Sequence, residues 1–433
     1  MRSRRVALWL VLILVVGAIT GAAVSFAGKA KPDFAWTLGS ASIVGQWTTS
    51  GSVVLGTESA LTAYSAATGA ELWTWNIPFQ DWLCAMSQSA PDGVGAVVYG
   101  LGPNQCTTLQ TIDLASGTAR WAPPLAIHSS QYLGSIEGDE GLSIGGSVVA
   151  TADAAAVPGT GTSDTLASID AATGTLSWAD GSWTIGGCDL SYDFDTVVLD
   201  GTVYAVAGCY SGSVLSYEAL LAIDAATGVP TDIGTLDPSA CIDSSGYSVA
   251  TISAFSGYLV VHCTGTLYAL AAGSTTLTRL DTTGVDTGPA GLDDNGSNSP
   301  LVNLVSHGST LYLVARSRAG HEDGIVAVDM ADGKQLWTAM LGGATEVSLL
   351  SANSGAVVAE GADGAADSAA LYSVGAADGR VTTTVGDLGG TATADFVGRT
   401  PAACLPAGGY AVCVFGFAEV GALKLPTASG KGS

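Results

Sequence analysis

The sequence is short of basic side chains. It has 14 Lys and Arg residues against 38 Asp and Glu residues in a chain of 433. Five of the basic residues fall in the first 31 positions, which contain no acid, so the remainder has 9 basic and 38 acidic side chains, a formal charge of −29. Because such a surface repels phosphate backbones, we do not expect nucleic acid as a ligand.

Several signatures of cofactor and metal chemistry are also missing. The sequence has no Walker-type phosphate loop, no Cys-x-x-Cys pair, no Cys-x-x-Cys-His haem site and no His-x-x-x-His spacing. The four histidines (His128, His262, His307 and His321) are scattered, and each is more typical of an ordinary loop or strand residue than of a metal ligand. The sequence therefore predicts no catalytic, cofactor-binding or metal-binding residue.

Long apolar runs are rare, and the one at the N-terminus is informative. An uncharged stretch from Val6 to Gly28 follows Arg2, Arg4 and Arg5, and it is long enough to cross a hydrocarbon core as a helix. Its length favours an uncleaved signal anchor, although Ser25-Phe26-Ala27 offers a small-residue cleavage site. The basic residues would stay cytoplasmic, so the rest of the chain is expected outside a bacterial cytoplasmic membrane, or secreted if cleavage occurs.

A repeated phrase dominates the rest of the chain. Asp170-Ala-Ala-Thr-Gly174-Thr-Leu-Ser-Trp178 shows it in full, and related copies recur every 45 to 60 residues, with turn glycines at positions 69, 117, 228, 273, 333 and 379. A period of this length indicates a propeller or an array. In each copy the Asp can accept hydrogen bonds from the turn that follows, and the Gly can adopt positive φ.

The two ends of the chain complement each other. Phe34 to Leu38 resembles the last strand of a repeat, whereas Tyr410 to Leu425 resembles the earlier strands of another. We expect the N-terminal strand to complete the C-terminal sheet and close a ring. The predicted fold class is all-β: an eight-bladed propeller of four-stranded antiparallel blades, preceded by one transmembrane helix or signal segment. Seven blades with loose ends is the alternative.

These features predict five regions. They are a cytoplasmic n-region at 1–5, the signal anchor or signal peptide at 6–28, a linker at 29–33, the propeller at 34–425 and a flexible tail at 426–433.

The Asp-x-x-Thr-Gly-x-x-x-Trp phrase resembles the repeat of the pyrroloquinoline-quinone-like propellers, and matches run from about Trp36 to Leu425. That family includes quinoprotein dehydrogenases and non-catalytic scaffolds, such as the propeller lipoprotein of the outer-membrane β-barrel assembly machinery. The resemblance implies that the repeated tryptophans dock neighbouring blades: Trp36, Trp73, Trp121, Trp178 and Trp337. Here no two cysteines are adjacent, unlike in the dehydrogenases, and basic partners for the carboxylates of the quinone are scarce.

Eight cysteines fall into pairs within single repeats. The pairs are Cys84/Cys106, Cys188/Cys209, Cys241/Cys263 and Cys404/Cys413. Antiparallel neighbours bring the start of one strand beside the end of the next, so each pair is a geometrically sensible disulfide. An even number of cysteines agrees with an oxidising compartment.

Together these observations favour a binding scaffold without catalysis, directed at an unidentified protein or envelope component. We expect no cofactor, and membrane contact only through the N-terminal segment. A degenerate quinoprotein dehydrogenase is the alternative. Calcium is a weaker prediction, and it rests on two acidic clusters, Asp189/Asp193/Asp195 and Asp293/Asp294.

Overall fold

A computed structural model describes most of the chain from residue 35 onward. The described residues are 35–39, 43–87, 89–101, 106–126, 142–145, 148–151, 166–180, 183–185, 188–191, 196–211, 214–237, 241, 250–263, 266–282, 304–316, 323–342, 344, 346–363, 368–387, 404–415 and 419–424.

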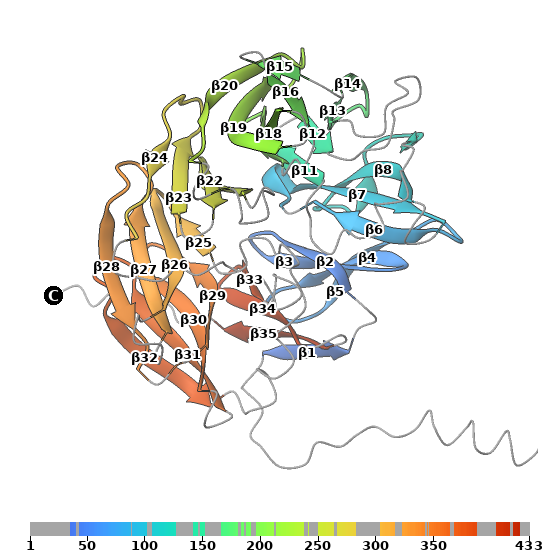
Figure 1. The fold of residues 1–433 in the computed structure, drawn as a ribbon. Coiled ribbons are helices and arrows are strands. Elements are labelled where there is room, and N and C mark those ends of the chain that lie inside the picture. The colour runs from blue at the N-terminus through green and yellow to red at the C-terminus, as the bar shows by residue number, and fades with distance from the viewer. Residues whose placement is uncertain are drawn as a thin grey trace, which may run out of the picture.

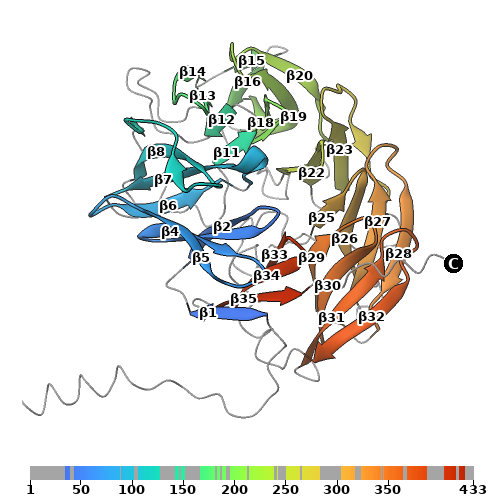
Figure 2. The same ribbon diagram turned by 180° about the vertical axis from the view of Figure 1, so that it is seen from behind.

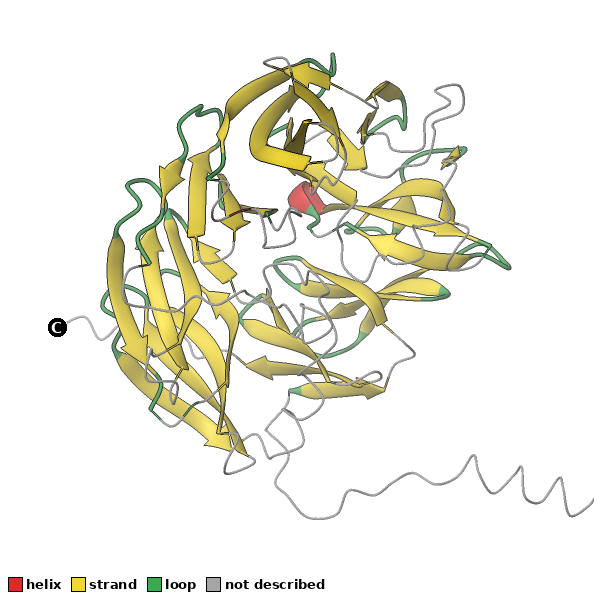
Figure 3. Ribbon diagram, in the orientation of Figure 1, coloured by secondary structure: helices red, strands yellow, loops and turns green. Residues whose placement is uncertain are grey.

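The described chain is built almost entirely from short antiparallel strands, with a 3-10 turn η1 at Pro91–Gly93 (Figure 3). Seven sheets are continuous in sequence, and an eighth combines strands from both ends of the chain. Figures 1 and 2 show the sheets arranged in a ring. The first strands of neighbouring sheets contact one another around its centre, as β2 does with β6 and β33.

The first four sheets are numbered here in chain order. The first contains β2 (Ile43–Thr48), β3 (Ser52–Thr57), β4 (Ala60–Ser65) and β5 (Glu71–Asn76). The second contains β6 (Trp82–Met86), β7 (Val94–Gly100), β8 (Cys106–Asp113), β9 (Thr118–Ala119) and β10 (Leu125–Ala126). The third contains β11 (Leu142–Gly145), β12 (Val148–Thr151), β13 (Leu166–Asp170) and β14 (Leu176–Asp180). The fourth contains β15 (Trp183–Ile185), β16 (Cys188–Ser191), β17 (Thr196–Leu199), β18 (Thr202–Ser211), β19 (Val214–Asp224) and β20 (Pro230–Thr235).

The remaining sheets complete the ring. The fifth contains β21 (Thr251–Phe255), β22 (Tyr258–Cys263), β23 (Thr266–Ala271) and β24 (Thr278–Arg279). The sixth contains β25 (Leu304–His307), β26 (Thr310–Arg316), β27 (Asp323–Asp329) and β28 (Gln335–Met340). The seventh contains β29 (Glu346–Ala352), β30 (Ala356–Asp363), β31 (Ser368–Gly375) and β32 (Val381–Asp387). The composite sheet contains β33 (Cys404–Ala407), β34 (Tyr410–Phe415), β35 (Glu419–Lys424) and β1 (Trp36–Gly39).

The composite sheet joins the two ends of the chain. Strand β1 pairs with β35 in antiparallel register, with Trp36 opposite Ala422 and Gly39 opposite Glu419. The Ala35 N–H extends the ladder by donating to the Ala422 carbonyl over 2.9 Å. The N-terminal strand therefore lies where the complementary chain ends predicted it.

The predicted fold class nevertheless needs correction. The prediction of eight uniform four-stranded blades is wrong. Only seven sheets are formed from consecutive sequence, and the second and fourth of these have five and six strands. In the second sheet the fourth strand is divided into β9 and β10, which both pair with β8. In the fourth sheet the first strand is divided into β16 and β17, and the short strand β15 pairs with β16. The predicted transmembrane helix or signal segment at 6–28 lies outside the described residues and stays a prediction. No helix in the described part of the chain combines the length and apolar character needed to cross a membrane, and residues 1–34 lie outside that part.

The repeated phrase forms a tight turn between the third and fourth strands. In the third sheet the Asp170 carboxylate accepts hydrogen bonds from the N–H groups of Ala172 (3.0 Å) and Thr173 (2.7 Å) and from the Thr173 hydroxyl (2.8 Å). The hydroxyl bond is the largest cause that holds the pKa of Asp170 below its ordinary value. Asp113 and Asp224 have the same arrangement with Ser116 and Thr227. The Asp role predicted from sequence is confirmed.

In five of the turns the glycine supports a tryptophan from the preceding sheet. Gly117 has φ of +69°, and a Cβ built on it would lie 2.4 Å from Cδ2 of Trp73. Each such indole also donates its Nε1–H to a main-chain carbonyl of the same turn. The pairs are Trp36 to Ala66 (2.8 Å), Trp73 to Leu114 (3.0 Å), Trp121 to Ala171 (3.0 Å), Trp178 to Ala225 (2.9 Å) and Trp337 to Ala376 (3.1 Å). We call this unit the indole–glycine dock.

The two boundaries, or seams, between the fifth sheet and its neighbours have no indole–glycine dock. Gly273 of the fifth sheet has the same positive φ, +72°, but nothing lies within 4 Å of its Cβ position. At Gly333 of the sixth sheet the neighbouring atom is the carbonyl oxygen of Arg279, not an aromatic ring. The fifth sheet is therefore joined to both neighbours without an indole, and its seams depend on the apolar packing between sheets.

The dock predicts unequal costs for one substitution at two equivalent turns. Gly117→Ala should destabilise the fold by the cost of positive φ, about 1–2 kcal/mol, plus an overpacking cost of about 1–3 kcal/mol against Trp73. Gly273→Ala should carry only the φ cost, because its Cβ would meet open space. Urea unfolding of both variants measures the difference. Equal losses would contradict the dock as a source of stability.

Candidate protein-binding face

The strand order gives the ring two different faces. On the face that we call the turn face, the third strand of each sheet ends in the glycine turn. On the opposite face, the loop face, the second strand ends and the chain crosses from one sheet to the next. The strand ends from which the segments 127–141, 152–165, 283–303 and 388–403 depart all lie at the loop face. Binding loops of repeat proteins usually gather on one such face.

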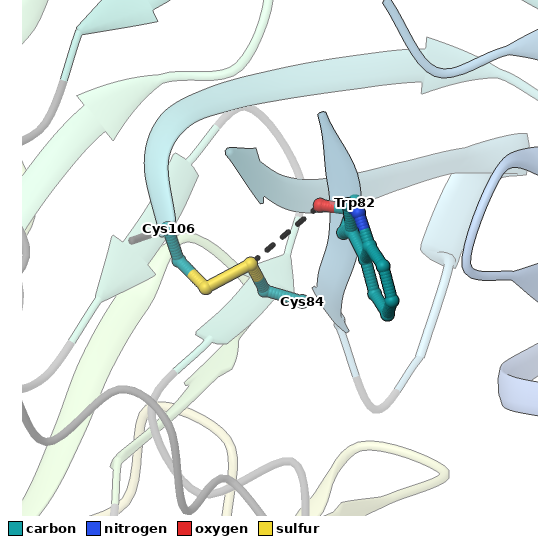
Figure 4. Close-up of a disulfide and its surroundings, with 3 residues drawn as sticks. All are labelled: Trp82, Cys84 and Cys106. Atoms are coloured by element: carbon teal, nitrogen blue, oxygen red, sulfur yellow. Dashed lines mark hydrogen bonds between the residues drawn. A yellow bond between two sulfur atoms is a disulfide. The ribbon is translucent and has the colours of Figure 1, made fainter. Parts of the chain in front are cut away.

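Disulfides lie at the loop face. Cys84 near the start of β6 is bonded to Cys106 at the start of β8, with a Cα–Cα distance of 6.0 Å (Figure 4). Cys241, between β20 and β21, is bonded to Cys263 at the end of β22, with a Cα–Cα distance of 4.6 Å. Both predicted pairs are confirmed. Because a preformed, covalently tied surface loses less entropy on binding, these bonds favour this face as the recognition surface.

The other two pairs stay predictions. Cys209 is disulfide-bonded, but the side chain of Cys188 lies outside the described residues, as do those of Cys404 and Cys413. The register places Cys404 directly opposite Cys413 on β33 and β34, which is a separation that a disulfide can bridge.

Three exposed apolar side chains gather at the loop face beside the first disulfide. Phe79 is 93% exposed, Leu101 65% and Trp82 43%. Phe79 lies in a turn closed by the hydrogen bond from Asp81 N–H to the Pro78 carbonyl. Trp82 is opposite Gly100 in the β6–β7 register, and Leu101 follows Gly100 directly. We call Phe79, Trp82 and Leu101 the aromatic patch.

The aromatic patch has a rigid base. Trp75 and Tyr99 pack edge to face on the neighbouring strands β5 and β7, with ring centroids 5.9 Å apart. Tyr99 is buried, and burial followed by the nearby Asp81 carboxylate raises the pKa of its phenol. Figure 4 shows the Cys84–Cys106 bond beside Trp82, whose carbonyl oxygen is 3.6 Å from Cys84 Sγ. Trp82 is thus on a strand that the disulfide ties to β8, whereas Phe79 lies in the turn that precedes this strand.

Other exposed apolar residues do not form such a group. Leu72, Val229, Leu336 and Val381 each stand just after a turn glycine, at or beside the fourth strand of a different sheet. Single apolar residues on a surface are common and indicate nothing specific. The aromatic patch differs because its three residues are neighbours at one crossing between sheets: Phe79 precedes Trp82 by three positions, and Leu101 follows the residue opposite Trp82.

A second cluster is fully buried between the fourth and fifth sheets. A carboxylate oxygen of Glu218 on β19 and the sulfurs of Cys241 and Cys263 all lie within 4.8 Å of one another. Apolar side chains of both sheets, including Leu236, Leu259 and Val261, surround the disulfide. Sequence reasoning paired the two cysteines but missed the glutamate, because Glu218 lies on the neighbouring sheet and belongs to no repeated motif.

The structure also places residues that sequence reasoning considered for chemistry. His262 is buried on β22, and burial lowers its pKa to about 4, whereas His307 is exposed at the end of β25. His128 and His321 lie outside the described residues, as do Asp193, Asp195, Asp293 and Asp294. Only the backbone of Asp189 is described, on β16, so the calcium prediction stays untested.

One motif escaped the sequence reasoning. Gly141-Leu-Ser143-Ile-Gly145 has the Gly-x-Ser-x-Gly spacing of a hydrolase nucleophile. In the structure Ser143 is only 4% exposed and lies within strand β11, and its hydroxyl accepts a hydrogen bond from the Val198 N–H over 2.8 Å. A buried serine on a strand, bonded to a neighbouring sheet, has the geometry of an inter-sheet link.

The family model described as outer membrane protein assembly factor BamB matches residues 15–271, more than half of the chain. The chain belongs to this family. The fold is also similar to that of BamB from Moraxella catarrhalis, which superposes with a TM-score of 0.50 at 13% identity, covering 90% of this chain and 98% of the other. A quinohemoprotein alcohol dehydrogenase from Pseudomonas putida HK5 gives a TM-score of 0.47 at 13% identity, covering 92% and 78%.

The family match and the superposition on BamB show a pyrroloquinoline-quinone-like propeller and leave the choice between scaffold and catalyst open. No curated protein matches the sequence. Membership of the BamB family therefore establishes the architecture.

The buried histidine predicts a pH dependence. Because the folded pKa of His262 is about 4 and the ordinary value is 6.5, the unfolded chain binds a proton more readily between these pH values. Stability from the neutral imidazole is then complete above pH 6.5 and is lost as pH falls toward 4, by at most about 3 kcal/mol. His262→Gln should have a flatter stability profile over this window in urea unfolding. An unchanged slope would contradict the assignment.

Proposed function

We propose that this BamB-family propeller is a non-catalytic scaffold that holds a protein partner at the loop face, through the aromatic patch. The observation that carries the proposal is the grouping of three exposed apolar residues, Phe79, Trp82 and Leu101, beside the Cys84–Cys106 disulfide. Buried aromatic anchors, tryptophan above all, supply most of the binding energy at protein interfaces. Rings already fixed in the free protein lose little freedom when the partner arrives.

The partner segment is best described by its chemistry. Glu58 and Asp81 border the patch, since Leu83 N–H donates to the Glu58 carbonyl and Asp81 directly precedes Trp82. The chain beyond residue 31 has a formal charge of −29, from 9 basic and 38 acidic residues. A segment that combines apolar side chains with Lys or Arg would fill the patch and meet this field favourably. The family description of an assembly factor agrees with a scaffold role.

The proposed location is the outer side of a cytoplasmic membrane. Disulfides form and persist in oxidising compartments, and two are present here. The uncharged stretch from Val6 to Gly28 would serve as the anchor. The linker to Trp36 is short, so an anchored propeller would stay close to the bilayer.

The patch can be tested with designed peptides. Binding of a peptide that alternates Leu and Lys should weaken at least about tenfold, or about 1.4 kcal/mol, when Phe79 and Trp82 are both changed to Ser. Leu72→Ser with Leu336→Ser is the matched control, because these side chains are 55% and 52% exposed on the outer strands β5 and β28. Fluorescence anisotropy at two salt concentrations gives both affinity and salt dependence.

Two outcomes would contradict the proposal. Equal binding by the patch variant and its control would remove the patch as the site. Robust turnover of an alcohol with added quinone and calcium would replace the scaffold with the dehydrogenase alternative.

A further inference from the structure

The buried cluster between the fourth and fifth sheets has a donor set that the scaffold function does not use. Glu218 is 0% exposed on β19, and Cys241 and Cys263 are also 0% exposed. One carboxylate oxygen and two sulfurs lie within 4.8 Å of one another. Thiolates and a carboxylate are both established ligands of Zn²⁺, and three protein ligands leave a fourth position for water.

The sulfurs are joined to each other in the structure, so the cluster cannot bind a metal in this oxidation state. A disulfide sulfur has no negative charge to offer, whereas a pair of thiolates has two. Reduction gives two buried thiols, which stay protonated in an apolar environment because an unpaired thiolate there is costly. A bound cation makes the thiolate forms favourable. A divalent metal ion meets this requirement.

We infer that Glu218, Cys241 and Cys263 form a reduction-gated zinc site. A dithiol reductant supplies two electrons and two protons: its own thiols become a disulfide, and the Cys241–Cys263 bond becomes two thiols. Zn²⁺ then displaces the two thiol protons, which pass to solvent, and binds both thiolates and the Glu218 carboxylate. The oxidised chain carries the bond, and the reduced chain carries the metal.

The cluster is fully buried, so a reductant reaches it when the seam opens locally. The seam between the fourth and fifth sheets has no indole–glycine dock, since nothing lies within 4 Å of the Gly273 Cβ position. Cys263 ends β22 and Cys241 lies in the crossing between sheets, so both are at the loop face. Local opening at such a seam costs less than opening at a docked one.

Cobalt is the probe for the test. The full chain is reduced with a phosphine, because dithiols chelate metals, and thiol release is counted before Co²⁺ is added. We expect one Co²⁺ per chain with thiolate-to-cobalt absorption after reduction and none before it, and Zn²⁺ should displace it. Cys84→Ser with Cys106→Ser is the matched control and should bind as wild type, because this pair belongs to no such cluster among the described residues.

Substitution of the cysteines and substitution of the glutamate should affect cobalt binding differently. Cys241→Ser with Cys263→Ser should lose the absorption band. Glu218→Gln should keep the band and bind Co²⁺ at least about tenfold more weakly, by analogy with the loss seen when groups that support metal ligands are removed. A fully reduced, folded chain without the band, or a band that persists in the double-serine variant, would overturn the assignment.

Reduction alone could unfold the chain, and circular dichroism would reveal it. In that case Zn²⁺ must restore the native spectrum in the wild type and not in the double-serine variant, since metal binding is then coupled to folding. Failure to restore the spectrum would equally overturn the site.

Discussion

The contact on which the ring depends most visibly is an indole lying on a glycine across the seam between two sheets. The turn residue must adopt positive φ, and it must also lack a Cβ because the ring occupies that volume. The indole N–H then bonds to a carbonyl of the same turn. In two seams that carbonyl is shared with a hydroxyl from the third strand, as when Thr111 joins Trp121 at Ala171 and Ser168 joins Trp178 at Ala225. Packing and hydrogen bonding thus fix the same pair of elements.

The two faces of the ring are stabilised by different chemistry. Indole–glycine docks are at the turn face, where the repeated phrase folds, whereas the two described disulfides are at the loop face, where the sequence varies. Long connections contribute little packing, so a covalent bond can fix the strands from which they depart. This division leaves exposed aromatic residues free for recognition without weakening the seams.

Much of this arrangement was readable from the sequence because it repeats. The phrase at Asp170–Trp178 gave the turn, the strand that follows and the spacing of the sheets, and the incomplete ends predicted the pairing of Trp36 with the C-terminal strands. Extra strands such as β15 have no repeat to announce them, which is why uniform four-stranded blades was wrong. The aromatic patch could not be predicted, because it depends on which residues of β6 and β7 lie opposite each other. Glu218 could not be predicted, because the cysteine Cys263 beside it belongs to a different sheet. Trp47 was missed for the same reason: it is buried outside the phrase and donates to Ser87 of the next sheet over 2.7 Å.

The pairing of β1 with β35 has a mechanical consequence. Any tension applied through the residues before Trp36 reaches the ring first at a four-residue strand, whose partner belongs to the opposite end of the chain. Pulled along its axis, β1 would load its ladder in shear, so that the hydrogen bonds would have to rupture together. The stacked contact of Trp36 on Gly69 of the first sheet would share that load. Detachment of this strand would remove the hydrogen-bonded link between the two ends of the chain and leave the closure to the apolar packing of β33–β35 against the first sheet.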